Sequence, residues 1–468
     1  MAEPLWTSDE IVAATGGVLG GEPFAATGVS IDTRSIEPGD LFVALAGVRD
    51  GHEFIDQALA KGAVGVLATR PGPGARIGVG DTLVALEALG IAARRRAAGA
   101  RRAAVTGSVG KTSVTQALAA ALALAGRAHA SVKSYNNHIG VPLTLARTPR
   151  DTQRAVFEVG MNHAGEIEPL SKMIAPHVAA VTTVGPVHME NFAEGEVGVA
   201  KAKAEIFAGL QPGGAAVLNA DNAWFDLLST RAREVGAQVI RFGSGEACEA
   251  RLTGFEDLAA GGARVRATLH GRPLDFPIRQ SGPHWGLNSL AVLLMLEALD
   301  APVGAGLEAL ATFEPLAGRG AVRRIALPGG AFTLIDESYN ANPVSMVAAI
   351  GALAARQEVA RRIVALTDML ELGPESPRFH AQLTAPIEAA GVDLVFCAGE
   401  RMQALWAALP ATRRGAYASE APGLATKIAE AVRPGDVVMV KGSNGSKAGV
   451  IVAELAALFD QAGEGAAH

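Results

Sequence analysis

Short apolar runs alternating with helical patterns make up most of this chain. Between residues 100 and 300, near-continuous apolar runs fall at 155–157, 178–184 and 216–218. Between and after them, apolar residues recur at helical spacing, which predicts helices at 112–125, 165–174, 197–209 and 286–299. Apolar strands with a helix between successive strands are typical of a mostly parallel sheet covered on both faces. We therefore expect a doubly wound α/β domain at the centre of the chain.

Similar alternation flanks this central part. Near the N-terminus, apolar runs at 41–45 and 63–67 enclose a short helical pattern at 55–61, and the Pro-Gly-Pro-Gly run at 71–74 predicts a linker there or just after it. A helical pattern starts again at about residue 81, and the insert at 248–280 has the alternating polarity of an antiparallel ribbon. Four further apolar runs predict a second doubly wound, Rossmann-like unit, at 332–335, 363–366, 394–396 and 437–440. The fold class is therefore α/β, with three domains at 1–80 (small), 81–318 and 319–468.

The clearest chemical motif is a glycine-rich turn between a predicted strand and a predicted helix. Its glycines let the backbone wrap around a triphosphate, and the start of the helix faces the negative charge. Lys111 can reach the outer phosphates, and the Thr112 hydroxyl suits Mg²⁺. Val105 stands where the usual P-loop pattern has its first glycine. A turn without ligand is the alternative, but the flanking strand and helix favour triphosphate binding by Thr106, Gly107, Ser108, Val109, Gly110, Lys111, Thr112 and Ser113.

Other polar residues near this motif suggest how it is used. The chain lacks a guanine-selective Asn-Lys-x-Asp motif, which favours ATP over GTP. Glu158 ends a predicted parallel strand, where a carboxylate would point into the ligand crevice and could bind Mg²⁺, the alternative being a solvated strand end. His188 follows the strand at 178–184, although loop histidines are more often structural. Lys201 and Lys203 lie two apart on one helix and face different sides, so we interpret Lys201 as a surface residue.

Together these segments resemble the Mur ligases, the ATP-dependent amide-forming enzymes of peptidoglycan precursor synthesis. The resemblance spans nearly the whole chain. Outside the P-loop, it is carried in the first two domains by residues 32–34, 38–45, 50–52, 136–142 and 158–162. Its most specific stretches, 336–343 and 368–373, are similar to the branch of the family that adds D-alanyl-D-alanine.

The resemblance implies an ATP-dependent ligase that joins D-alanyl-D-alanine to UDP-N-acetylmuramoyl-tripeptide through an acyl phosphate. The N-terminal domain would bind the UDP substrate, the central domain ATP, and the C-terminal domain the dipeptide. ATP and two Mg²⁺ ions are the implied cofactors, and Lys203 would be carbamylated. The implied catalytic residues are Lys111, Lys203, His188 and Arg319, and the metal ligands are Thr112, Glu158, His188 and Lys203. Further ATP contacts would come from His284, Asn288, Arg319 and Asp336, and substrate contacts from Thr33, Arg34, Asn136, Asn137, Tyr339, Asn340 and Asn342.

Four residues depart from the usual family pattern. Thr183 and Trp285 each stand where the family usually has asparagine, Glu337 where it has aspartate, and Asn444 where this branch commonly has arginine. Another amide ligase of the superfamily, of the folate or cyanophycin type, would share the ATP loop, but the N-terminal block and residues 340–343 argue against it. A nucleotide-regulated interaction module without enzymatic activity is the alternative from a different class.

Composition narrows the classes further. The 468 residues are 49% hydrophobic and 19% charged, which is typical of a globular protein. A net charge of −6 does not favour nucleic acid as a partner. No apolar run approaches the roughly 18 residues of a membrane span. Two cysteines and no visible signal peptide indicate a reducing compartment, so we expect a cytoplasmic enzyme, and a monomer.

Overall fold

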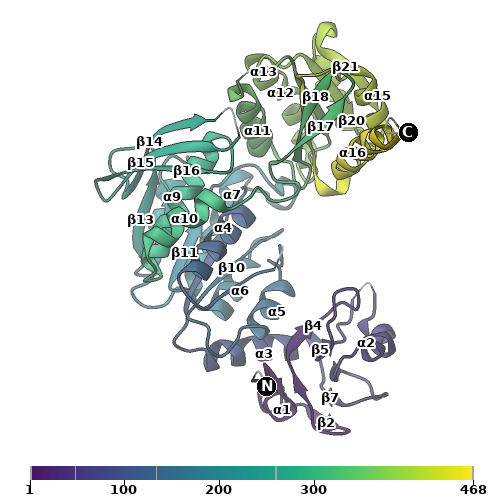
Figure 1. Cartoon of the computed structure of the whole chain (residues 1–468). Coiled ribbons are helices and arrows are strands. Elements are labelled where there is room, and N and C mark those ends of the chain that lie inside the picture. The colour runs from purple at the N-terminus through teal and green to yellow at the C-terminus, as the bar shows by residue number, and fades with distance from the viewer. Residues whose placement is uncertain (1–2, 48, 133, 259–260, 358, 466–468) are drawn as a thin grey trace.

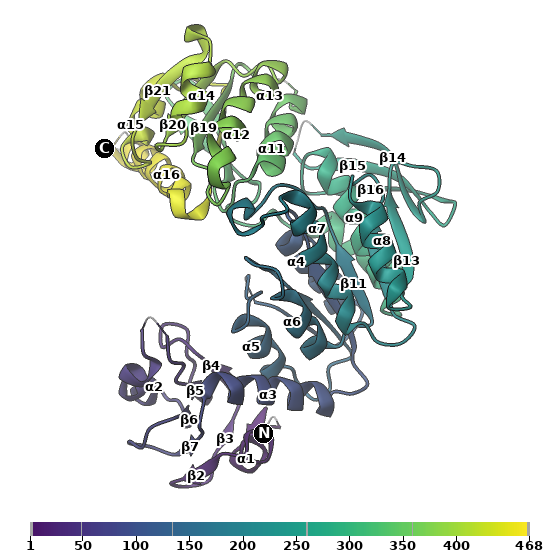
Figure 2. The ribbon, with the colours of Figure 1, turned by 180° about the vertical axis from the view of Figure 1, so that it is seen from behind.

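Three α/β units follow one another along the chain, each built on its own sheet (Figure 1). The computed structural model describes residues 3–47, 49–132, 134–258, 261–357 and 359–465. The central unit lies between the other two, which contact it at different ends (Figures 1 and 2). The sequence-based prediction of an α/β fold with mostly parallel sheets is confirmed.

The N-terminal unit contains a five-stranded sheet in the order β2-β7-β6-β5-β4, counted over the described residues. Every pairing in this sheet is parallel except that of β2 with β7. A small antiparallel pair, β1 with β3, lies outside it. The elements are β1 Trp6–Thr7, α1 Ser8–Thr15, β2 Val18–Gly20, β3 Ala25–Ala26, β4 Gly28–Ser30, β5 Asp40–Val43, η1 Gly51–Phe54, α2 Ile55–Ala60, β6 Gly65–Ala68 and β7 Arg76–Gly78.

Helix α3, Thr82–Arg96, joins this unit to the central one. Asp81 caps its first turn by accepting hydrogen bonds from the backbone N–H groups of Leu83 and Val84. Its buried residues, including Leu86 and Leu89, share a core with the N-terminal strands and also pack near α5. This helix therefore belongs as much to the N-terminal core as to the central domain, and the boundary at residue 80 stays a prediction.

The central sheet has nine strands within the described ranges, in the order β16-β15-β14-β13-β12-β11-β8-β10-β9. All pairings from β14 to β9 are parallel, while β14, β15 and β16 form the predicted antiparallel ribbon and continue the same sheet. The strands are β8 Arg101–Thr106, β9 Ala128–Ala130, β10 Arg154–Glu158, β11 Val178–Val181, β12 Ala215–Asn219, β13 Gln238–Gly243, β14 Ala250–Asp257, β15 Ala263–Leu269 and β16 Arg272–Ile278.

Helices cover both faces of this sheet, as the apolar strands predict. One core contains buried residues of α4, α9 and α10, and the core on the opposite face contains those of α5, α6, α7 and α8. These elements are α4 Lys111–Leu124, α5 Gly140–Ala146, α6 Ile167–Ile174, η2 Met189–Asn191, α7 Glu196–Ala204, η3 Glu205–Gly209, α8 Phe225–Glu234, α9 Pro283–Ala298 and α10 Val303–Thr312.

The C-terminal unit repeats this plan on a smaller scale, with a sheet in the order β17-β18-β22-β19-β20-β21 among the described residues. Only the β17–β18 pairing is antiparallel. Helices α11, α13 and α14 contribute to the core on one face, and α15 and α16 to the core on the other. The elements are β17 Ala321–Leu327, β18 Gly330–Glu337, α11 Pro343–Ala355, β19 Arg362–Thr367, η4 Gly373–Glu375, α12 Ser376–Gln382, α13 Thr384–Ala389, β20 Leu394–Ala398, α14 Gln403–Ala408, η5 Ala411–Arg413, β21 Arg414–Ala418, α15 Leu424–Ala431, β22 Val437–Lys441, η6 Asn444–Ser446 and α16 Ala448–Gly465.

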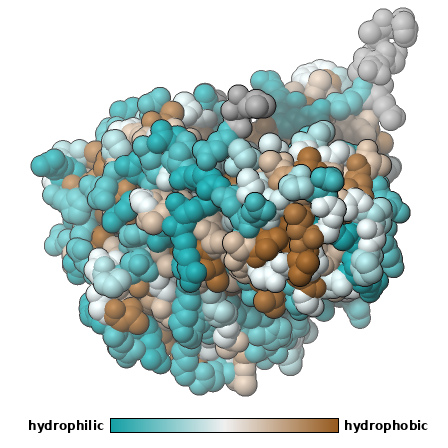
Figure 3. Space-filling model, turned by 90° about the horizontal axis from the view of Figure 1, so that it is seen from below, coloured by the Kyte–Doolittle hydropathy of each residue, from teal (hydrophilic) through white to brown (hydrophobic). Residues whose placement is uncertain are grey.

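The surface differs from these apolar cores. The face seen in Figure 3 is mostly hydrophilic, and its apolar side chains gather in small groups. None of the helices in the described part of the chain is both long and apolar enough to cross a membrane.

Candidate active site

A cavity of about 860 Å³ lies where the central and C-terminal units meet. The turns after β8, β10 and β11 and the end of β12 line it from the central sheet, and the turn after β18, helix α11 and the end of β22 line it from the C-terminal sheet. Ligands of doubly wound sheets bind beyond the carboxyl ends of the strands, and here two such edges share one space. Sixteen of the predicted site residues line the cavity: Ser108, Val109, Gly110, Lys111, Thr112, Ser113, Asn136, Asn137, Glu158, His188, His284, Asn288, Arg319, Tyr339, Asn340 and Asn342.

The glycine-rich turn has the tight backbone that phosphate binding requires. Gly107 and Gly110 have φ values of +150° and +88°, and a side chain at Gly107 would clash with the Thr182 hydroxyl. That hydroxyl donates a 2.5 Å hydrogen bond to the Val109 carbonyl, and the Lys111 Nζ donates one of 2.7 Å to the Gly107 carbonyl. The loop is therefore already folded around the place where phosphates would lie. Thr106 and Gly107 do not line the cavity. They form the start of the loop, where the Gly107 carbonyl holds Lys111.

Glu158 is a buried carboxylate with one free oxygen. Its Oε1 accepts a 2.7 Å hydrogen bond from the Asn136 Nδ2, but its buried Oε2 has no hydrogen-bond partner among the described residues. A buried charged oxygen without a partner is costly unless a ligand or ion satisfies it. Asn136 thus both lines the cavity and orients the carboxylate.

Two lysines with lowered pKa values belong to this part of the central unit, Lys111 near the carboxylate and Lys203 near Lys111. Burial lowers the pKa of Lys111, an effect that Glu158 opposes and Arg319 reinforces. Burial, with a smaller contribution from Lys111, brings the pKa of Lys203 well below its usual range. Lys203 lies behind the cavity wall rather than in its lining, whereas Lys201 is at the surface and pairs with Glu194 at 2.8 Å. The interpretation of Lys201 as a surface residue is confirmed.

The first turns of α9 carry two of the predicted ATP contacts. His284 and Asn288 lie four residues apart and so share one helix face. Burial lowers the pKa of His284, and its Nδ1 has no partner within the described ranges. The Asn288 amide approaches Gly110, so this face lies directly beside the P-loop.

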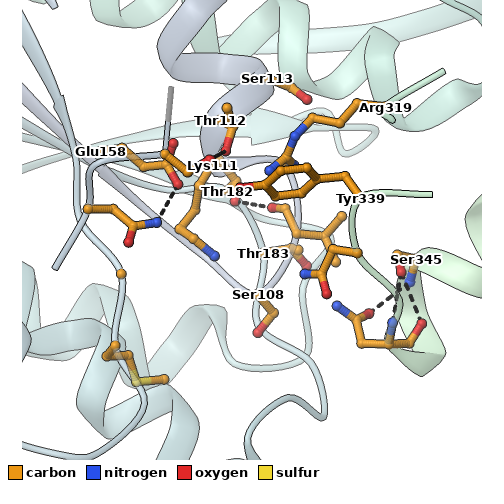
Figure 4. Close-up of a pocket in the computed structure, with 18 of the residues that line it drawn as sticks. Ser108, Lys111, Thr112, Ser113, Glu158, Thr182, Thr183, Arg319, Tyr339 and Ser345 are labelled. Carbon is orange, nitrogen blue, oxygen red and sulfur yellow. Dashed lines mark hydrogen bonds between the residues drawn. The ribbon is translucent and has the colours of Figure 1, made fainter. Parts of the chain in front are cut away.

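The C-terminal unit places an arginine and a tyrosine over the same cavity. The Arg319 guanidinium lies 4.1 Å from the centre of the Tyr339 ring, and Figure 4 shows the pair beside the P-loop side chains. Asn342 lines the cavity but also caps α11, its Oδ1 accepting a 2.9 Å hydrogen bond from the Ser345 backbone N–H. Asp336 does not line the cavity, because its carboxylate accepts hydrogen bonds from the backbone N–H of Gly318 and from the Ser338 hydroxyl. It shapes the turn that carries Arg319.

The two predicted UDP contacts lie away from this cavity. Thr33 is buried and donates a 2.8 Å hydrogen bond to the Gln57 Oε1, while the largely exposed Arg34 pairs with Asp32 at 2.6 Å. Neither lines the cavity, so their role in substrate binding stays a prediction.

The structure adds one lining residue and two charged contacts that local sequence patterns do not reveal. Asn219 ends β12, in the same strand position that points to Glu158, and lines the cavity. The Lys441 Nζ, buried in the lining, is 3.3 Å from the Glu337 Oε2. His188 Nδ1 is 2.5 Å from the Glu371 Oε2, and this contact lowers the pKa of Glu371. Both pairs join segments far apart in the sequence.

No group of three His, Cys, Asp or Glu side chains arranged to hold a metal occurs in the part of the chain that the structure describes. A cation here would need hydroxyl, phosphate or modified side-chain ligands in addition to Glu158 and His188.

A P-loop sheet that shares one charged cavity with a second doubly wound unit defines a class of nucleotide-using enzymes in which two domains enclose the reactants. Family comparisons are more specific. The Mur ligase middle domain matches residues 105–296, the glutamate ligase domain of Mur ligases residues 321–444, and the Mur ligase catalytic domain residues 25–122. The chain belongs to the Mur ligase family.

Individual relatives narrow the comparison. The chain is similar to the UDP-N-acetylmuramoyl-tripeptide–D-alanyl-D-alanine ligase of Escherichia coli, with 34% identity over 93% of this chain and 95% of the relative. The corresponding ligase of Bacillus subtilis is 32% identical, over 92% of this chain and 93% of the relative. A crystal structure of MurF from Acinetobacter baumannii has a TM-score of 0.84 at 27% identity, covering 96% of this chain and 98% of that one.

Proposed function

We propose that this chain is an ATP-dependent ligase that joins D-alanyl-D-alanine to UDP-N-acetylmuramoyl-tripeptide in peptidoglycan precursor synthesis. The observation that carries this function is the shared cavity, in which the P-loop, the free oxygen of Glu158 and the Arg319–Tyr339 pair face one space. The ATP-binding unit and the C-terminal unit thus meet at one cavity, where a phosphoryl group could be transferred from ATP to a second substrate. Relatives with the same activity align over nearly their whole length.

The reaction must turn a carboxylate into an amide, and hydroxide is a poor leaving group. The terminal carboxylate of the tripeptide attacks the γ-phosphorus of ATP, forming an acyl phosphate and releasing ADP. The amine of D-alanyl-D-alanine then attacks the acyl carbon, phosphate leaves, and the new amide nitrogen loses a proton. The products are the amide, ADP and inorganic phosphate.

The main physical obstacle is the approach of one anion to another. Lys111, held at the P-loop, and Arg319, held against the Tyr339 ring, provide positive charge on two sides of the transferring phosphoryl group. Because both are enclosed, their attraction to phosphate is screened less than it would be in water. The two residues would stabilise the charge that develops during transfer.

Mg²⁺ fits the residues of this site. The unpartnered Oε2 of Glu158 and the nearby Thr112 hydroxyl are the oxygen donors that Mg²⁺ prefers, and His188 and Lys203 complete the proposed ligand set for two ions. When bound, Mg²⁺ would neutralise phosphate charge. The unmodified amine of Lys203 is a poor Mg²⁺ ligand, so we propose that it reacts with carbon dioxide and loses a proton to give a carbamate. The low pKa of this amine favours the neutral form that such a reaction needs.

The remaining assignments follow from the same function. The N-terminal unit, with Thr33 and Arg34, would hold the UDP end of the substrate, and the C-terminal unit, with Asn340 near Tyr339, the dipeptide. We propose that the enzyme works as a cytoplasmic monomer, because its nucleotide substrates are cytoplasmic metabolites and the described chain alone forms a cavity lined by most of the predicted ATP-site residues.

A phosphate-release assay tests the function directly. Purified protein would be incubated with Mg²⁺-ATP, UDP-N-acetylmuramoyl-tripeptide and D-alanyl-D-alanine, omitting one component at a time. We expect phosphate release only in the complete mixture, and the diaminopimelate and lysine forms of the tripeptide can be compared in parallel. Activity with a single amino acid in place of the dipeptide would indicate another ligase of the superfamily. Nucleotide binding without turnover in any mixture would overturn the enzymatic function.

A further inference from the structure

The loop that follows β19 contacts the proposed metal ligand His188 from outside the cavity. This loop contains Glu371, and its Oε2 lies 2.5 Å from the His188 Nδ1, although the ring is not aligned for a regular hydrogen bond. His188 lines the cavity, whereas Glu371 does not. The carboxylate therefore meets the imidazole at Nδ1, and the second ring nitrogen, Nε2, takes no part in this contact.

The loop that carries Glu371 is held firmly in place. Its backbone N–H groups at Met369 and Leu370 donate 3.0 Å hydrogen bonds to the His380 Nε2 and the Ser443 Oγ. Met369 and Leu372 on either side of the glutamate are buried in the C-terminal core. Glu371 itself has a φ of +63°, a conformation that L-residues adopt rarely and that persists only where the surrounding structure holds it. The carboxylate is thus presented from a rigid support.

The histidine lies on a loop that is tied to the ATP site and also contacts the C-terminal unit. The Ser108 hydroxyl of the P-loop donates a 3.0 Å hydrogen bond to the Gly185 carbonyl, three residues before His188. A side chain at Gly185 would clash with Val344 of α11, so the two units approach closely there. A second contact joins η2, directly after His188, to η4, directly after the Glu371 loop. The position of the C-terminal unit therefore affects the conformation of the loop that carries His188.

We propose that Glu371 is a positioning residue that reaches across the domain interface, fixes the orientation of His188 and leaves Nε2 to bind the cation. Metal-binding histidines usually donate their other ring N–H to a carboxylate or carbonyl, which sets the tautomer and the ring orientation. Here that partner comes from a different domain, so a complete metal site requires the C-terminal unit to be docked. This inference rests on the proposed function, because it takes His188 as a metal ligand.

The test uses Glu371→Gln in the full chain, with Mn²⁺ as the probe metal. We expect the dissociation constant for Mn²⁺, measured by electron paramagnetic resonance with ADP bound, to rise about 10-fold or more. The Mg²⁺ concentration for half-maximal phosphate release should rise similarly, with a smaller change in kcat at saturating metal. Glu371→Asp, which keeps the charge, should recover part of the affinity. Glu375→Gln is the matched control, because Glu375 lies four residues away and pairs with the exposed Arg378.

Double substitution separates orientation from a general structural effect. In a His188→Ala background, Glu371→Gln should change Mn²⁺ affinity no further, because no imidazole remains to be oriented. Unchanged Mn²⁺ binding in Glu371→Gln, equal losses in Glu375→Gln, or additive losses in the double variant would each overturn the inference. Failure of the proposed function has a different signature, since wild-type protein would then release no phosphate in the complete substrate mixture.

Discussion

The two walls of the cavity differ in whether their charged side chains have partners within the protein. On the central wall, Lys203 is buried, Lys111 is partly buried, and Glu158 keeps one oxygen without a partner among the described residues. On the C-terminal wall, Glu337 is paired with Lys441, and the Asp336 carboxylate is satisfied by the turn around it. Both walls are carboxyl edges of doubly wound sheets, so topology does not explain the difference. The central wall therefore has charged groups left to bind a ligand. On the C-terminal wall, these carboxylates already have partners within the protein, so this wall mainly gives the cavity its shape.

The largest effect should come from removing the P-loop amine. In Lys111→Met we expect kcat/KM for phosphate release to fall about 10³-fold, because a preorganised cation would be lost from an enclosed site. Lys201→Met is the matched control, since Lys201 is a surface residue paired with Glu194. If both variants lost activity to the same extent, the loss in Lys111→Met could not be assigned to the position of Lys111 at the P-loop.

Glu158→Gln should separate activity from stability. We expect about a 10²-fold loss of kcat/KM through weaker cation binding, with a melting temperature equal to or above that of the wild type. Stability should not suffer, because the substitution removes a buried charge that is only partly hydrogen-bonded. Glu205→Gln should behave in the opposite way, since its carboxylate accepts hydrogen bonds from the Gly165, Ile167 and Glu168 backbone N–H groups. A destabilised but fully active Glu158→Gln variant would contradict the comparison.

On the C-terminal wall, a smaller effect is expected from the aromatic ring under Arg319. Tyr339→Leu removes the ring face and should lower kcat/KM about 5-fold, corresponding to roughly 1 kcal/mol of cation–π interaction. Tyr339→Phe keeps the ring and should stay close to wild type. If Phe and Leu lower the rate equally, the tyrosine hydroxyl rather than the ring would be the functional group.

The smallest expected effect is a pH-dependent shift in stability at Lys203. Its pKa is lowered in the folded protein, so between that value and the ordinary lysine pKa the unfolded chain binds more protons. The wild type should therefore gain stability as pH rises through this window. Lys203→Met lacks this gain, so in CO₂-free buffer its advantage in melting temperature, a few degrees at pH 7, should shrink towards pH 10. A constant difference across that range would show that the lysine keeps its ordinary pKa.

Local patterns predict the central sheet and the P-loop because each depends on neighbouring residues. The apolar runs and the glycine spacing around Gly107 and Gly110 are sufficient to predict both. Short strands at the sheet margin, such as the three-residue β9, lack a pattern long enough to recognise. Asp336 and Asn342 show another limit, because motif position cannot reveal that a side chain is used to cap a turn or a helix.

Contacts between residues far apart in the sequence could not be predicted for a different reason. The pairs His188–Glu371 and Glu337–Lys441 join residues more than one hundred positions apart. The first depends on how the central and C-terminal units are placed, the second on the pairing of β18 with β22, and no periodicity or local motif records either arrangement. Lys203 could be predicted only in part. Helical spacing shows that it faces a different side from Lys201, but its burial depends on tertiary packing.

The outer strands of the central sheet have a consequence for the behaviour of the protein at high concentration. An unpaired strand edge can recruit a strand from another chain and start aggregation. One edge, β9, is only three residues long, and the other, β16, carries Pro273 and Pro277, which have no amide hydrogen to offer. The same strand places the charged Asp275 between the two prolines. We therefore expect little intermolecular strand pairing at either edge of the central sheet, even at high protein concentration.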